Sequence, residues 1–277
     1  MNWRAVRAIA RKDLYEVRHN RMVWMPMIVL PVVFCLVLPL VMILVAQAAG
    51  QDAPDALLDP DLAQMLANLP QSVKAELEDL NGNQQMIMLI LGFLFAPLFL
   101  ILPIMTASTI GTNSFVGEKE RKTIESLLYT PATDRELFIG KMLAAIVPAL
   151  VITWLSFILY TLILNVAGAP VMGRVWFPTS AWYPLILWVT PAVAAMGVLG
   201  AVLVSARAST FMEAYQTTGV LVVPLLLLVF GQVFGLISLS VELALVIGLL
   251  VWLVDLALLW ASQRLFSRYR LFESGRL

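Results

Sequence analysis

The chain has one cysteine, Cys35, and one histidine, His19. A single cysteine cannot form a disulfide framework or a cysteine-rich metal site, and a single histidine excludes motifs that need two. Charge is also scarce, because Asp, Glu, Lys and Arg make up 13% of the 277 residues, against about 25% in an average protein. The formal net charge is zero, so no global basic field would attract nucleic acid.

Apolar residues are abundant, at 61% of the chain, where an average protein has about 45–50%. Charge is absent from residues 22–51, 80–117, 142–173 and 175–206, and residues 214–263 contain only Glu242 and Asp255. A helix needs about 20 apolar residues to cross a bilayer, and a transmembrane β-strand would alternate apolar and polar residues, which these runs do not. We therefore predict an all-α integral membrane protein that forms a single transmembrane domain over 1–277. Its six spans are expected near 23–47, 86–108, 142–168, 182–204, 217–237 and 242–262.

The basic residues indicate how these spans are oriented. With six spans, all Lys and Arg residues except Lys74 and Arg174 fall on the side that holds both termini. Cytoplasmic loops carry an excess of Lys and Arg. The sequence therefore predicts a multi-pass protein of the cytoplasmic (inner) membrane, with both termini in the cytoplasm.

Two segments outside the spans have a pattern of their own. Residues 2–20 predict an amphipathic helix in the membrane interface, and both a topology anchor and a partner-binding role stay open. Its expected apolar face consists of Trp3, Val6, Ala10, Leu14 and Val17. The outer loop, 48–85, is acidic and would either attract cations or form a solvated cap, and Asn81-Gly82 predicts the end of a helix within it.

The segment between spans two and three, 109–141, holds the most informative pattern. Ile124, Leu127 and Leu128 form an apolar stripe at helical spacing within a charged stretch. Pro131 predicts a break, and Thr133 with Glu136 three residues later has the form of a capping box that starts a helix leading into span three. A short charged helix with an apolar ridge suits docking onto a soluble partner, and from the residues alone it suits lying on the membrane surface equally well.

Motifs for catalysis are missing from the chain. Gly140-Lys141 is followed by Met142 and is not preceded by a glycine at position 135, so no Gly-x-x-x-x-Gly-Lys-Ser/Thr loop exists to bind the phosphates of ATP. No His-Glu-x-x-His motif exists either. We predict no catalytic residue, no metal site and no cofactor bound by this chain, which leaves a transporter, a channel or a membrane scaffold.

One ionisable residue, Asp255, falls inside a predicted span. It precedes Arg264 by nine residues, which is about 13 Å along a helix. An acid at that depth is costly and is a functional-site hypothesis by default, because it could carry a proton or a cation. The alternative is a buried acid that only positions neighbouring helices.

Residues 118–141 resemble the signature of the membrane subunits of type-2 ABC exporters. Those subunits show a mixed-charge run, then Thr-Ile/Leu-Glu-x-Leu-Leu, a proline, Glu-Leu and Gly-Lys. The matching residues here are Glu118, Glu120, Thr123, Ile124, Glu125, Leu127, Leu128, Pro131, Glu136, Leu137, Gly140 and Lys141. The six spans and the basic amino-terminal helix extend the resemblance over the chain at the level of architecture.

The resemblance implies a permease subunit of an ABC exporter, paired with a second permease copy in the lipid bilayer. A separate ATPase subunit would bind ATP and Mg and would hold the coupling helix between spans two and three. Substrate would pass between the two permeases along spans one, two and five. These spans are mostly apolar, which favours a hydrophobic or amphiphilic substrate such as a drug, a peptide or a lipid-linked molecule, with sodium as the second candidate. An ATPase-independent carrier or channel, or a membrane scaffold, is the alternative function.

Overall fold

The computed structural model describes residues 1–49, 73–74, 77, 80–121, 132–234, 236–237 and 239–265. Within these residues the regular elements are all helical, and six helical stretches are long and apolar enough to cross a membrane. The predicted fold class, an all-α protein with six spans, is confirmed.

The spans are composite helices interrupted by π-helical and 3₁₀-helical segments. Helix α1 (Trp3–His19) precedes span one, and α11 (Ala169–Met172) follows span three. Span one consists of α2 (Arg21–Pro31), a π segment (Val32–Val37) and α3 (Leu38–Ala49), and span two consists of α6 (Gly82–Ile87), a π segment (Met88–Leu94), α7 (Phe95–Phe99) and α8 (Ile101–Glu120). Span three is α10 (Asp134–Val166), and span four consists of α12 (Trp182–Pro184), a π segment (Leu185–Val189) and α13 (Thr190–Ser205). Span five consists of α14 (Phe211–Thr218), a 3₁₀ segment (Gly219–Val222) and α15 (Val223–Val233), and span six is α16 (Val241–Leu265).

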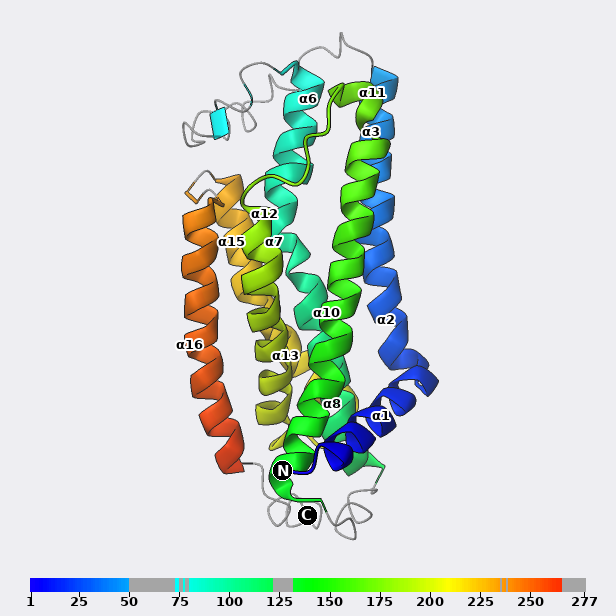
Figure 1. Ribbon diagram of the computed structural model, residues 1–277, viewed down its shortest axis with the longest axis vertical. Helices are drawn as coiled ribbons and strands as arrows, with labels where there is room; N and C mark the ends of the chain where they lie inside the picture. Colours follow the sequence, from blue (N-terminus) through cyan, green and yellow to red (C-terminus); the bar gives the residue numbers. More distant parts are fainter. Residues whose placement is uncertain are drawn as a thin grey trace.

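The spans form an elongated bundle with two of them at its centre (Figure 1). In the most apolar window of spans two and four, 78% of the residues are buried, against 17–28% in the other four spans. Helix α1 lies obliquely across one end of the bundle, beside α8 and the start of α10 (Figure 1). We call this the basal end; the C-terminal part of α16 lies there too.

Two helices extend beyond the spans expected from hydropathy. Helix α8 continues to Glu120 and α10 begins at Asp134, so residues 109–120 and 134–141 of the expected loop 109–141 are helical. The capping box predicted the helix over 134–141, and only the extension over 109–120 was not expected. The polar residues Thr112, Asn113 and Ser114 sustain α8 because they are buried against the rest of the bundle. Hydropathy detects the apolar part of a helix but not a helix that continues into polar, buried sequence. Residues 122–131 of the expected coupling segment lie outside the described residues.

The start of span two also differs from expectation. Asn81-Gly82 was expected to end a loop helix, but Asn81 instead caps α6: its side chain accepts from Gln84 N, and the Gln84 side chain accepts from Asn81 N. Asparagine is among the best N-cap residues, so the same dipeptide fits a helix start. Most of the acidic outer loop, 50–72, lies outside the described residues.

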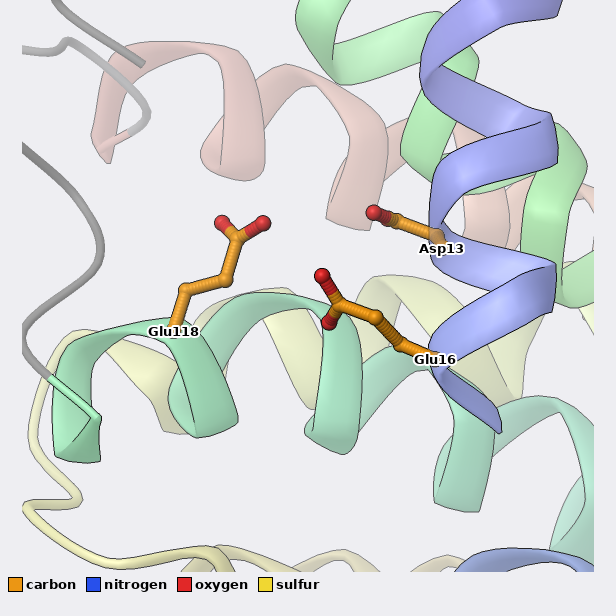
Figure 2. A group of neighbouring side chains, drawn as sticks. All are labelled: Asp13, Glu16 and Glu118. Atoms are coloured by element: carbon orange, nitrogen blue, oxygen red, sulfur yellow. The ribbon is translucent and has the colours of Figure 1, made fainter. Parts of the chain in front are cut away.

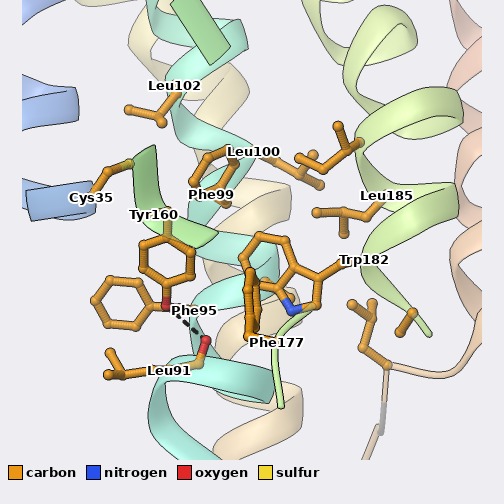
Figure 3. Close-up of a cluster of buried hydrophobic side chains, with 14 of the residues drawn as sticks. Cys35, Leu91, Phe95, Phe99, Leu100, Leu102, Tyr160, Phe177, Trp182 and Leu185 are labelled. Atoms are coloured by element: carbon orange, nitrogen blue, oxygen red, sulfur yellow. Dashed lines mark hydrogen bonds between the residues drawn. The ribbon is translucent and has the colours of Figure 1, made fainter. Parts of the chain in front are cut away.

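An aromatic cluster fills the core between spans two, three and four (Figure 3). The Tyr160 hydroxyl donates to the Leu91 carbonyl at 2.7 Å, and Trp182 Nε1 donates to the Gly92 carbonyl at 2.7 Å. Both carbonyls belong to the π segment of span two, where the regular helical hydrogen-bond ladder is altered. These two side chains therefore fix the irregular backbone of span two to spans three and four.

Candidate functional site

Helix α1 turns a face containing a charged residue toward the bundle. Val6, Asp13 and Val17 are buried on this face, while Trp3 and Leu14 are exposed. Of the expected apolar face of α1, Val6 and Val17 therefore contact the bundle, whereas Trp3 and Leu14 do not. The helix packs against α10 and α8, so its orientation follows from these protein contacts.

The Lys141 ammonium of α10 lies at the centre of the basal end. Its Nζ is 2.8 Å from Glu118 Oε2 of α8 and 3.3 Å from Asp13 Oδ2 of α1. It also donates to the Ser114 carbonyl at 2.6 Å, and the Ser114 hydroxyl donates to Asp13. The three charged side chains are only 2–3% exposed. One cation therefore joins three helices in a site that water does not reach.

A second, more exposed layer of charges surrounds this centre. Lys12 pairs with Glu118 and, at 3.1 Å, with Glu16, while Arg121 Nη2 lies 3.0 Å from Glu16 Oε2. Partial burial alone would lower the pKa of Lys12, but the carboxylates, Glu118 foremost, raise that pKa above its ordinary value. Because Asp13, Glu16 and Glu118 are matched by Lys12, Lys141 and Arg121, the whole cluster has a formal charge of zero.

Three carboxylates of this cluster point toward one another (Figure 2). One oxygen from each of Asp13, Glu16 and Glu118 lies within 4.8 Å of the others. Such a set of oxygens is the type that binds a hard cation. Here the Lys12 and Lys141 ammonium groups already bind these oxygens and balance their charge. The arrangement is therefore an ion-pair junction, and we define it as the basal junction: Lys12, Asp13, Glu16, Glu118, Arg121 and Lys141.

Gly140 allows α1 to reach this junction. A Cβ atom added at Gly140 would lie 2.9 Å from Ile9 Cγ2 and 3.1 Å from the Val6 carbonyl oxygen. A side chain at position 140 would push α1 away from α10. Gly140 thus allows the backbones of α1 and α10 to approach closely, and the next residue, Lys141, provides the buried cation.

Glu136 fixes the first turn of α10. The predicted capping box is confirmed, since Thr133 accepts from Glu136 N and Glu136 accepts from Thr133 N. The same carboxylate accepts from the backbone N–H of Asn2, just before α1. The start of α10 is thereby joined to the start of α1.

The end of α8 is joined to span five. Glu120 accepts from the backbone N–H of Phe211 at 2.8 Å, and Lys119 donates to the Ala208 carbonyl at 3.2 Å. Glu118 and Glu120 therefore connect α8 to different neighbours. A hollow of about 590 Å³ lies between the first turns of α10 and Gln263 of α16.

The structure brings together only part of the predicted coupling site. Glu118, Glu120, Glu136, Gly140 and Lys141 lie at the basal end as described. The remaining predicted residues lie outside the described part of the chain: Thr123, Ile124, Glu125, Leu127, Leu128 and Pro131.

Sequence reasoning missed the contribution of α1 to this site. Asp13 follows Val6 by seven residues and precedes Val17 by four, so it shares their helical face. An acid at helical spacing within an apolar face is the signal that could have identified it.

The other predicted site residue, Asp255, lies far from the junction in sequence and on α16. Its side chain is 4% exposed, and neither carboxylate oxygen has a hydrogen-bond partner among the described residues. It takes no part in the ion pairs of the basal junction.

Comparison with known proteins identifies the family. A family model described as "ABC-2 family transporter protein" matches residues 7–266. The chain belongs to the ABC-2 transporter family. No curated protein and no solved structure shows a significant match.

The match to the ABC-2 transporter family includes most of α1 and all six spans. This ABC-2 protein is therefore a multi-pass membrane permease of an ABC exporter, and a permease of this family is a transport component that is not itself catalytic. The resemblance drawn from residues 118–141 is confirmed at the level of the family.

Proposed function

We propose that this ABC-2 permease works with a separate ATPase subunit that binds its basal end on the cytoplasmic side of the membrane. ATP and Mg would bind that subunit. The distribution of basic residues supports the orientation, because all Lys and Arg except Lys74 and Arg174 fall on the side of the basal end. The family itself implies partnership with an ABC ATPase.

The basal junction is the observation that carries this proposal. Glu118 and Arg121 precede the segment between spans two and three, and Lys141 follows it. The ion pairs connect both flanks of this segment to each other and to α1. A force applied to the segment by a partner would therefore move α1, α8 and α10 together, because breaking a buried ion pair costs about 3–5 kcal/mol.

The exposed faces of the spans support a dimeric permease with an apolar substrate. Spans one and five bury little of their surface within one chain and expose large apolar residues such as Val29, Val41, Leu227 and Phe230. Span two is mostly buried within the chain, and spans three and six bury as little as spans one and five, so the assignment of the pathway to spans one and five of two paired copies rests on the family resemblance. Their apolar surfaces favour a hydrophobic or amphiphilic substrate over sodium.

The test is purification of tagged full-length chain from its own host in a mild detergent, with and without crosslinking in intact membranes. We expect two copies of the chain with two copies of a soluble ATPase, measured by mass photometry and mass spectrometry. Leu128→Asp should remove the ATPase. The matched control, Leu236→Asp, makes the same change at a 79% exposed position between α15 and α16 and should retain it. Recovery of the chain alone after crosslinking would contradict the proposal and favour an ATPase-independent carrier or scaffold.

A further inference from the structure

Asp255 is a buried acid in the middle of a transmembrane helix, without a hydrogen-bond partner in the part of the chain that the structure describes. Both of its oxygens are inaccessible to solvent, and neither accepts a hydrogen bond from the residues that the structure describes. Buried side-chain polar atoms nearly always have at least one partner, so two unsatisfied oxygens on one side chain require an explanation.

The elements that pack most closely on α16 offer no countercharge. They are α12, the π segment Leu185–Val189 and α13. None of the three contains Asp, Glu, Lys, Arg or His, and their titratable residue, Tyr183 of α12, is exposed. Within α16, Glu242 precedes Asp255 by thirteen residues and Arg264 follows it by nine, about 20 Å and about 13 Å along the axis.

The surroundings of Asp255 do not suit a metal cation. Hard cations need several oxygen ligands. The hydroxyls of α13 already donate within their own span, Thr190 to the Leu185 carbonyl and Ser205 to the Val202 carbonyl. A cation bound by the Asp255 carboxylate, with no other oxygen available to bind it, would lack most of its ligands.

A proton removes the charge of the same carboxylate without any further ligand. Leaving an ionised carboxylate unpaired in an apolar site is far more costly than burying the neutral acid, and the group neutralises instead. Two more buried polar atoms without partners lie on α16, Trp252 Nε1 and Ser262 Oγ. They are three residues before and seven residues after Asp255, so all three side chains share one helical face. This face forms a polar strip in an otherwise apolar seam against span four.

We propose that Asp255 is a proton-binding site: the protonated acid holds α16 against α13, and release of the proton to water opens this seam to solvent. The proton is the ligand, and the polar strip of Trp252, Asp255 and Ser262 is the path that water follows when the seam opens. The proposal does not depend on the ATPase partnership, because it concerns packing within one chain.

The first test uses a hydrophobic carbodiimide, which reacts with protonated carboxyl groups inside membranes, on membranes that contain the full-length chain. Mass spectrometry of the α16 peptide should show Asp255 modified at neutral pH, with labelling that falls about tenfold per pH unit once the acid ionises. Replacing sodium with choline should leave labelling unchanged. Asp255→Asn should abolish it, and Glu242→Gln should not alter the labelling of Asp255. No labelling at neutral pH, or protection by sodium, would overturn the proposal, the latter in favour of a cation site.

The second test separates the proton from a merely structural side chain. Asn has the shape of a neutral Asp but does not ionise, so Asp255→Asn should unfold at the wild-type temperature at about pH 3, where the acid is protonated in both the folded and the unfolded protein. From about pH 4 upward the wild type should lose thermal stability that the variant retains, because the unfolded acid ionises while the folded acid keeps its proton, and the loss should level off once the folded acid ionises too. Equal loss in both proteins would overturn the proposal. Loss of ATPase binding in the purification experiment would leave both of these outcomes unchanged.

Discussion

Gly140 of α10 lies so close to Ile9 of α1 that an added Cβ atom would be 2.9 Å from Ile9 Cγ2. The next residue, Lys141, forms ion pairs with Asp13 of α1 and Glu118 of α8. Two neighbouring residues thus determine how α1 docks: the glycine permits the approach, and the lysine neutralises the acid that the approach buries.

Gly140→Ala should displace α1 from α10. Overpacking of a tight contact costs about 1–3 kcal/mol, and here the nearest atoms include the Val6 carbonyl of the backbone. Thermal unfolding of the purified protein should therefore begin at a lower temperature. Gly219→Ala is the matched control, because an added Cβ there meets nothing within 4 Å. Equal effects of the two substitutions would contradict the docking role of Gly140.

Lys141→Met should be among the most destabilising single substitutions at the basal end. Removing the ammonium leaves Asp13 and Glu118 buried with less compensation, at a cost of about 3–5 kcal/mol. Arg121→Gln, which removes an exposed cation of the same junction, should cost at most about 1 kcal/mol. Denaturation curves of both variants and of the wild type measure how much each substitution lowers the free energy of unfolding.

A double variant tests whether the cost of Lys141→Met comes from the charge left behind. Asp13→Asn combined with Lys141→Met should be more stable than Lys141→Met alone, because the uncompensated carboxylate is gone. Additive losses from the two substitutions would show that Lys141 and Asp13 act independently, which would contradict the junction.

The Lys12 pairs should withstand mild alkali. Because the pKa of Lys12 is raised in the folded protein, its contribution to stability is fully present below the pKa of an unfolded lysine, about 10.4. The contribution declines only as the pH rises from there toward the folded value. The difference in unfolding temperature between wild type and Lys12→Gln should be the same at about pH 7 and about pH 9 and smaller at about pH 11. A difference in unfolding temperature that already shrinks by about pH 9 would contradict a raised pKa of Lys12 in the folded protein.

Tyr160→Phe should loosen the π segment of span two. The substitution removes the hydroxyl that donates to the Leu91 carbonyl and leaves this buried acceptor without that donor, at a cost of about 1–2 kcal/mol. Tyr183→Phe makes the same chemical change at an exposed position and should be neutral. Denaturation curves of the two variants compare the effects, and identical curves would show that the hydrogen bond does not stabilise span two.

Several parts of the fold follow from local sequence. The six spans were predictable because a long charge-free run can satisfy its backbone in a bilayer only as a helix. The start of α10 was predictable because a capping box involves residues three apart, Thr133 and Glu136. Each of these features depends on neighbours along the chain.

Other local signals were ambiguous. Asn81-Gly82 fits either the end of one helix or the start of the next, and the bundle determines that it starts α6. Helix α8 extends past its apolar residues because Thr112, Asn113 and Ser114 are buried within the bundle. Hydropathy does not register the burial of polar side chains.

The sequence by itself determined the number of spans, the helical class and the family signature around Gly140-Lys141. Only the tertiary structure decided that Asp13 faces inward, that Lys141 joins it to Glu118, and that Asp255 is buried with no hydrogen-bond partner among the described residues. The physical reason is that a charge can be buried only where its countercharge is brought alongside. Asp13 and Lys141 are 128 residues apart, so their pairing depends on three helices meeting, and no periodicity along the chain contains that information.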